Sequence, residues 1–253
     1  SGLMSFTGLP GSPPVKVGVP IADMNAGMFA TYGILTAYIH KLRKGEGQYL
    51  EVSLLEAAIA YTVWESGSYF ATGNEPGPLG SSHRLSAPYQ ALRTRDGHIN
   101  IGAPNQSNYE RFCRALDRVN LIERDEFKDN ASRLANREAL EIELENTLAA
   151  KTSEQWLEVM DKAGVPAGPI LTMSEVWADE QVQARDLDVP LEHPTAGTVR
   201  NIGLAAKLYG TPGRITEPAP VFAQHTREVL IQAGYTSDEI SALVKSGAIA
   251  IAK

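Results

Sequence analysis

The chain has 253 residues, a length that fits one large domain or two modest ones. Its hydrophobic fraction of 43% and charged fraction of 21% are ordinary for a globular protein. A net charge of −7 argues against nonspecific binding to nucleic acid or to an anionic membrane surface. No apolar run approaches the roughly 20 residues of a membrane span, so we expect neither nucleic acid nor membrane as a partner.

The single cysteine, Cys113, excludes an internal disulfide and agrees with a cytoplasmic location. It lies within a helical pattern, so we interpret it as a buried structural thiol rather than a nucleophile. The five histidines are scattered without the spacing of metal ligands, and no metal site is expected.

Residues 1–17 are rich in Gly, Pro and Ser and read as an irregular loop that leads into a long helical pattern over residues 18–48. Small residues occupy one face of this helix, which predicts that it is buried on more than one side. The other face carries apolar residues at spacings of four and three: Met28, Tyr32, Leu35, Ile39 and Leu42.

Asp23 lies at the start of this helix, where the helix dipole favours a carboxylate. One interpretation is an N-cap whose oxygen accepts the backbone N–H of Ala26 or a near neighbour. The other is a catalytic carboxylate, acting as a nucleophile on an acyl carbon or as a base beside an acidic C–H bond. The position alone leaves both open.

Residues 49–53 alternate like a short strand, and residues 54–70 resume helical spacing. A strand between two helices favours an α/β fold with a parallel sheet. Periodicity then stops over residues 71–87, which carry His83 and Arg84 near their end. This stretch is either a linker or a mobile lid over a site.

A small α+β domain is predicted over residues 76–190. Strands at 88–93 and 98–103 flank an Asp-Gly pair, which is typical of a hairpin. Helices are expected at 105–116 and 136–150. They are also expected after a capping box at Thr152 and, as one short helix, at 174–183.

The domain division places a large-domain segment at residues 1–75 and a return linker with C-terminal helices at 191–253. The last part contains a proline-rich stretch, a helix near 226–233 and a capping box that starts at Thr236. We expect these helices to return to the large domain.

Several separated motifs, in the right order, resemble the class III CoA-transferase family. This family includes formyl-CoA and carnitine CoA-transferases and the alpha-methylacyl-CoA racemases. The motifs are SGLMSFTGLPGSPPVKVGVPIAD, RKGEGQYLEVSLLEA, APYQALRTRDGHINIG, AGVPAGPILTMSEVWADEQVQAR and PAPVFAQHTREVLIQAGYTSDEI.

The resemblance implies that Asp23 is the catalytic carboxylate. It would attack an acyl-CoA thioester to form an aspartyl-acyl anhydride, and CoA thiolate would convert this to an aspartyl-CoA thioester. Coenzyme A and acyl-CoA would be substrates rather than permanently bound cofactors. The family's small-domain loop would fall at 79–84, so His83 and Arg84 are candidates for binding CoA.

The resemblance also implies that the fold is the remnant of a Rossmann-like large domain together with the small domain. The N-terminal Rossmann-like segment would lie on a longer chain or on a complementary N-terminal chain, and the full-length protein would be an interlocked homodimer. Two alternatives to CoA transfer stay open: an acyl-CoA racemase that uses Asp23 as one acid/base, and a truncated or partner chain without activity of its own.

Overall fold

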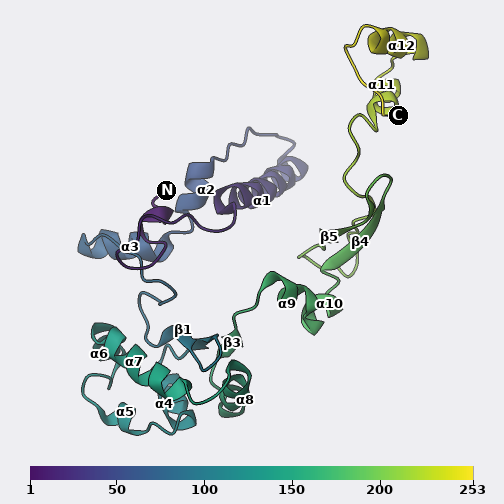
Figure 1. Cartoon of the computed structure of the whole chain (residues 1–253). Coiled ribbons are helices and arrows are strands. Elements are labelled where there is room, and N and C mark those ends of the chain that lie inside the picture. Colours follow the sequence, from purple (N-terminus) through teal and green to yellow (C-terminus); the bar gives the residue numbers. More distant parts are fainter. Residues whose placement is uncertain (253) are drawn as a thin grey trace. The chain divides into compact units, whose positions relative to one another are not determined.

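The computed structural model describes residues 1–252 and divides into two compact units, Ser1–Ile170 and Leu171–Lys253 (Figure 1). The first unit contains two parts that we describe in turn. One is the long helix with its neighbours, and the other is a sheet-and-helix body over residues 89–169, which supplies most of the buried core.

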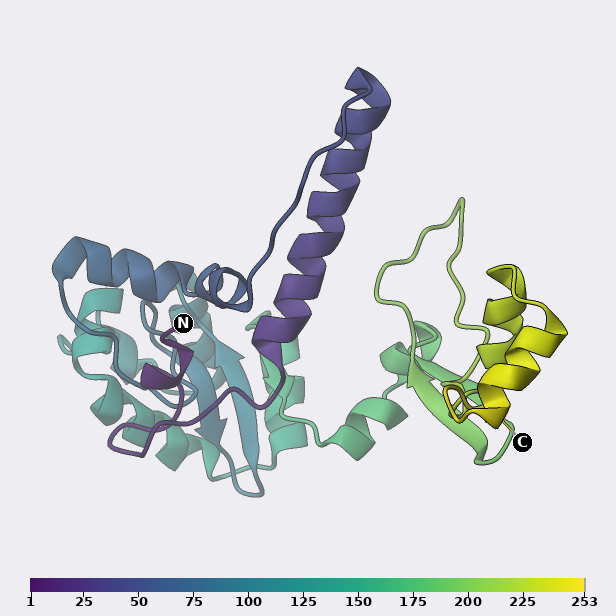
Figure 2. The same cartoon turned by 90° about the horizontal axis from the view of Figure 1, so that it is seen from above.

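The first unit opens with a 3₁₀ turn, η1 (Leu3–Ser5), and the long helix α1 (Ile21–Lys44). Gly45 ends α1 in the left-handed region at φ 79°, and its N–H donates to the Lys41 carbonyl. The following extended segment runs back along the helix, as Figure 2 shows. A Cβ placed on Gly33 would lie 3.1 Å from Leu50, so a small residue is needed where this segment passes.

The expectation that α1 is buried on more than one side is wrong for this chain. Asn25 is its one buried residue. Members of the apolar stripe are largely open to solvent, including Leu35 at 56% and Leu42 at 68% exposed. The spacing identified the apolar face correctly, but within residues 1–252 little packs against that face.

The predicted strand at 49–53 is also wrong, because the segment is extended but pairs with no strand among the described residues. The predicted helix at 54–70 is interrupted and forms α2 (Leu54–Ile59) and α3 (Val63–Thr72). The Thr62 hydroxyl lies at the break, where it donates to the Ile59 carbonyl at 2.8 Å.

The sheet-and-helix body contains a three-stranded antiparallel sheet in the order β1-β2-β3. The predicted hairpin is confirmed: β1 (Tyr89–Arg93) pairs with β2 (His98–Gly102), and β3 (Ala167–Pro169) adds to the far side of β2. Thr94 closes the turn, since its N–H donates to the Gly97 carbonyl at 2.9 Å.

Five helices pack with this sheet and bury an apolar core. Cys113 is fully buried within it, which confirms the structural thiol, and burial raises its pKa to about 11. The core includes Leu92, Ile101 and Leu144. The helices are α4 (Gln106–Ala115), α5 (Asn120–Glu123), α6 (Asn130–Ala135), α7 (Arg137–Leu148) and α8 (Ser153–Ala163).

Local sequence signals set the ends of α8. The predicted capping box is confirmed: the Thr152 hydroxyl accepts the Gln155 N–H, and the Gln155 side chain accepts the Thr152 N–H at 3.1 Å. Gly164 ends the helix in the left-handed region. These signals are local, so they do not depend on what the helix packs against.

The second unit begins with α9 (Met173–Ala178) and α10 (Glu180–Ala184). One helix was expected over 174–183. Asp179 breaks it, because its extended backbone makes it the N-cap of α10 and its carboxylate accepts two backbone N–H groups. The hairpin β4 (Asp188–His193) and β5 (Gly197–Ile202) follows.

The chain continues to α11 (Thr226–Gln232) and α12 (Ser237–Lys245). The capping box predicted at Thr236 is confirmed, with Glu239 as its reciprocal partner. Taken by unit, the fold is a mixture of helices and antiparallel sheet, and no strands pair in parallel within residues 1–252. No described helix is both long enough and apolar enough to cross a membrane.

Candidate functional site

Asp23 lies in the first turn of α1, two residues after the helix begins. The capping interpretation is wrong, because Pro20 holds the cap position and no side chain caps this helix. The carboxylate is exposed, and it has no hydrogen-bond or ion-pair partner within residues 1–252. It is therefore free to react or to bind a ligand.

The backbone around Asp23 offers donors as well. Met24 donates to the Pro20 carbonyl at 3.0 Å, whereas the N–H groups of Ala22 and Asp23 find no acceptor in the described chain. Two residues further on, Asn25 is buried and its Nδ2 has no partner there either. A helix start with free donors beside an unpaired carboxylate can hold negative charge that develops on a substrate.

His83 lies in the loop before β1, between two aromatic rings. It stacks on Tyr89 with ring centroids 5.0 Å apart and meets the edge of Trp64 at 4.9 Å. Its Nδ1 accepts the Leu85 N–H at 3.1 Å. The imidazole therefore fixes the local loop, and its Nε2 is the ring nitrogen left for another partner.

Arg84 holds the same loop from its other side. Its guanidinium donates to the Gly77 carbonyl at 2.7 Å and lies 3.6 Å from the Glu65 carboxylate of α3. The side chain is 19% exposed, and its Nε has no hydrogen-bond partner among the described residues. The arginine thus links the loop to α3 and still carries an unsatisfied donor.

A third residue of this cluster, Arg137, was not among the residues predicted from the sequence. It is the first residue of α7, and its guanidinium donates to the His83 carbonyl at 2.9 Å. Burial, reinforced by the charge of Arg84, lowers the pKa of Arg137. A cation in the first turn of a helix opposes the dipole, and that was the available sequence signal.

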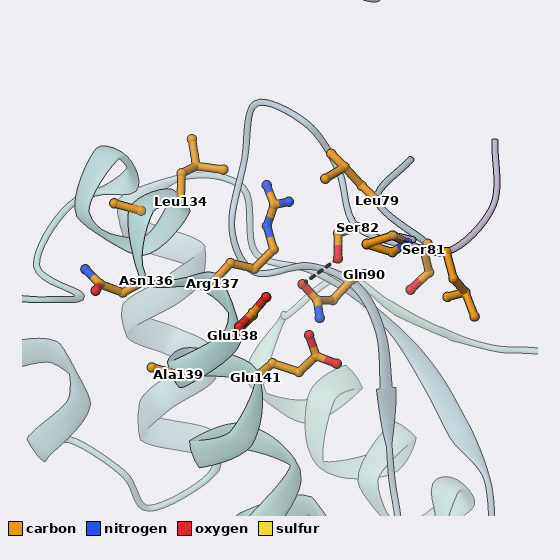
Figure 3. A pocket seen from close by; sticks show the side chains of 14 residues that line it. Leu79, Ser81, Ser82, Gln90, Leu134, Asn136, Arg137, Glu138, Ala139 and Glu141 are labelled. Carbon is orange, nitrogen blue, oxygen red and sulfur yellow. Dashed lines mark hydrogen bonds between the residues drawn. The ribbon is translucent and has the colours of Figure 1, made fainter. Parts of the chain in front are cut away.

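The structure brings His83, Arg84 and Arg137 together, but it records no contact between any of them and Asp23. Beside the cluster lies a cavity of about 690 Å³ (Figure 3). Its lining comes from the N-terminal loop, the 79–82 loop, β1, the end of α6 and the start of α7. A backbone hydrogen bond from Gly80 to Gly8, 2.8 Å long, joins the two loops.

Comparison with known proteins supplies the family. Residues 1–226 match CoA-transferase family III, so the chain belongs to that family. The match begins before Asp23, covers the first unit and extends into the second as far as residue 226.

Curated relatives are similar over almost the whole chain. The succinyl-CoA:glutarate CoA-transferase of Homo sapiens is 32% identical over 98% of this chain and 57% of its own length. The succinate–glutarate CoA-transferase of Agrobacterium fabrum is 31% identical over 92% of this chain and 58% of its own length. The chain thus spans a little over half the length of these relatives.

A solved structure shares the fold. A CAIB/BAIF family protein from Brucella suis superimposes with a TM-score of 0.76 at 28% identity. The match covers 91% of this chain and 60% of that chain.

Proposed function

We propose that this chain is the part of a class III CoA-transferase that carries the catalytic carboxylate, and that Asp23 is its nucleophile. The proposal rests mainly on one combination: the family match includes Asp23, and the structure leaves this carboxylate unpaired at the start of α1. A carboxylate already held in an ion pair would be a weaker nucleophile, because the reaction would first have to break that pair.

The proposed chemistry moves CoA between two carboxylic acids without water or a redox partner. An Asp23 oxygen attacks the thioester carbonyl of the donor, the C–S bond breaks, and CoA thiolate leaves an aspartyl-acyl anhydride. The thiolate then attacks the aspartyl carbonyl, which releases the donor carboxylate and forms an aspartyl-CoA thioester. The acceptor carboxylate repeats the two steps in reverse, regenerating Asp23 and yielding the new acyl-CoA.

The free N–H groups of Ala22 and Asp23 belong to the same turn as the nucleophile. Each tetrahedral intermediate bears an oxyanion, and backbone donors at a helix start are suited to stabilise one. His83 and Arg84 are proposed to bind CoA: the imidazole has its Nε2 available, and the guanidinium places a positive charge beside it, suited to a phosphate.

For the substrates we propose succinyl-CoA as donor and a dicarboxylic acid as acceptor. The support is that curated relatives are named for such pairs, among them a succinyl-CoA:mesaconate CoA-transferase of Haloarcula marismortui, 30% identical over 92% of this chain and 58% of its own length. We further propose that the active protein is a homodimer and that a Rossmann-like segment completes the CoA site.

Mass spectrometry tests the nucleophile directly. The full-length protein is incubated with succinyl-CoA, and we expect a CoA adduct, the aspartyl-CoA thioester, on the peptide that carries Asp23. Asp23→Ala and Asp23→Asn should remove the adduct and lower transfer to glutarate by at least about a thousandfold. A matched control is Asp238→Asn, since Asp238 is likewise an exposed acid in a first helical turn.

Near-normal transfer by the Asp23 variants would contradict the proposal. The racemase alternative makes a different prediction, namely exchange of the α-proton of a 2-methylacyl-CoA in D₂O without a protein adduct. That pattern would replace the transferase assignment.

A further inference from the structure

The cavity beside α7 has charged groups of opposite sign that do not neutralise each other. Arg137 contributes a guanidinium, and Glu138 and Glu141 contribute two carboxylates. Among the described residues neither glutamate has an ion-pair or hydrogen-bond partner. The cavity therefore presents separated charges that remain available to a ligand.

Arg137 and Glu141 are four residues apart on one helix, the spacing at which such residues commonly pair. They do not pair here, because Arg137 instead donates to the His83 carbonyl at 2.9 Å. In the view of Figure 3 the guanidinium extends away from the carboxylates of Glu138 and Glu141. The tertiary bond to the loop thus keeps the two charges of α7 apart.

At the Arg137 end of the cavity, the guanidinium has a hydrogen-bond donor without an acceptor. Arg137 is only partly buried, and its Nη1 makes no hydrogen bond within residues 1–252 and is not among the buried unpaired atoms, so this nitrogen is left for a ligand. A carboxylate is the acceptor that pairs best with a guanidinium. This end of the cavity favours a ligand carboxylate.

The rest of the lining restricts which other chemical groups the ligand can carry. Ser82 and Gln90 are polar and neutral, joined by a hydrogen bond of 3.2 Å. Leu9, Leu79 and Leu134 supply apolar contacts. A dicarboxylate would meet repulsion from the two glutamates, and a diamine would meet it from Arg137. A molecule with one carboxylate, a short apolar chain and one ammonium group satisfies both ends.

We propose that this cavity binds a small zwitterion of the amino-acid type, with its carboxylate on Arg137 and its ammonium group between Glu138 and Glu141. The site contains no atom of Asp23, and its occupation does not depend on CoA transfer. It is separate from Asp23 but adjoins the loop that carries His83 and Arg84, the residues proposed to bind CoA.

Three probes of nearly equal length separate the charge types: 5-aminopentanoate, glutarate and 1,5-diaminopentane. Each is titrated into the full-length protein by isothermal calorimetry at neutral pH and low salt, without CoA. We expect 5-aminopentanoate to bind at least about tenfold more tightly than either of the other two. The Asp23→Asn variant should bind it unchanged, so failure of the transferase proposal would leave this result standing.

Two variants identify the site. Glu138→Gln combined with Glu141→Gln should weaken 5-aminopentanoate about tenfold or more and improve the relative binding of glutarate. These glutamates hold no other part of the described fold, so loss of folding is not expected. Arg137→Gln should also weaken the binding of 5-aminopentanoate. The matched control is Glu154→Gln, which changes an exposed acid in the first turn of α8 and should leave this binding unchanged.

Tighter binding of glutarate that Arg137→Gln weakens would overturn the proposal in favour of a dicarboxylate site in this cavity, and tighter binding of the diamine that the double glutamine variant weakens would overturn it in favour of a cation site. Absence of binding by all three probes up to about 10 mM would show that the cavity has no such ligand. An unchanged affinity in the double glutamine variant would place the ligand elsewhere.

Discussion

The long helix α1 and the sheet-and-helix body over residues 89–169 have similar apolar patterns but opposite surroundings. In the body the patterned residues are buried, and Leu144 of α7 has no exposed surface. In α1 the patterned residues are largely exposed, and Asn25 alone is buried. An apolar stripe therefore reports which face of a helix can be covered, while the covering itself has to be found in the tertiary structure.

The largest effect on stability is expected from truncating the core of the body. Leu144→Ala should lower the free energy of unfolding by about 3 kcal/mol, because it removes buried contacts and leaves a cavity. Urea unfolding followed by circular dichroism measures it. A loss below about 1 kcal/mol would mean that the α7 core is looser than its burial indicates.

A smaller loss of stability is expected from removing a helix cap, and it distinguishes a side chain that caps a helix from one that only lies near its start. Thr152→Ala removes a side chain that accepts the Gln155 N–H and should cost about 1 kcal/mol. Asp23→Ala should cost only a few tenths of a kcal/mol, because its carboxylate caps nothing and contributes only through the helix dipole. Thermal unfolding of both variants checks this, and equal losses would restore the capping role of Asp23.

Acid should weaken the body through Glu143. Arg118 and Arg124 each donate to its carboxylate at 2.6 Å and hold the pKa of Glu143 below its ordinary value of 4.5. A lowered folded-state pKa means that the stabilisation is complete above the unfolded pKa and is lost as pH falls through the folded one.

Glu143→Gln should therefore flatten the fall in urea midpoint below about pH 4.5. At neutral pH the variant should be the less stable protein, and the two midpoints should converge in acid. If the urea midpoints of the two proteins fell in parallel as the pH is lowered, Glu143 would not be the group responsible for the loss of stability in acid.

The smallest effect is expected on α1. Leu35→Ala removes an exposed side chain and should change the free energy of unfolding of this chain by less than about 0.5 kcal/mol. The measurement matches that for Leu144→Ala, the same substitution in the other region. A loss as large as that of Leu144→Ala would show that the apolar stripe is covered in solution.

Much of the body could be predicted from the sequence because its signals are local. The Asp-Gly pair predicted the hairpin, and the capping box at Thr152 predicted the start of α8; in the second unit the capping box at Thr236 predicted the start of α12. The strand at 49–53 failed because a strand exists only with a partner, and alternation cannot supply one. The helix at 174–183 failed because Asp179, an acceptable interior residue by pattern, adopts an N-cap conformation.

The candidate site divides in the same way. Asp23 was found from its place at a helix start, and the family resemblance gave it a proposed role. Arg137 was missed because its partner, the His83 carbonyl, is 54 residues away along the chain. No periodicity within α7 reports such a contact.

By itself, the sequence determined the family, the position of Asp23 and the starts of α8 and α12, since each motif and capping box is made of residues close together in the chain. Tertiary structure alone decided that α1 is exposed within this chain and that Arg137 turns from Glu141 to the loop. Each of these outcomes depends on contacts between residues far apart in the chain. A local pattern shows which partners a side chain could have, and burial and competing hydrogen bonds decide which partner it takes.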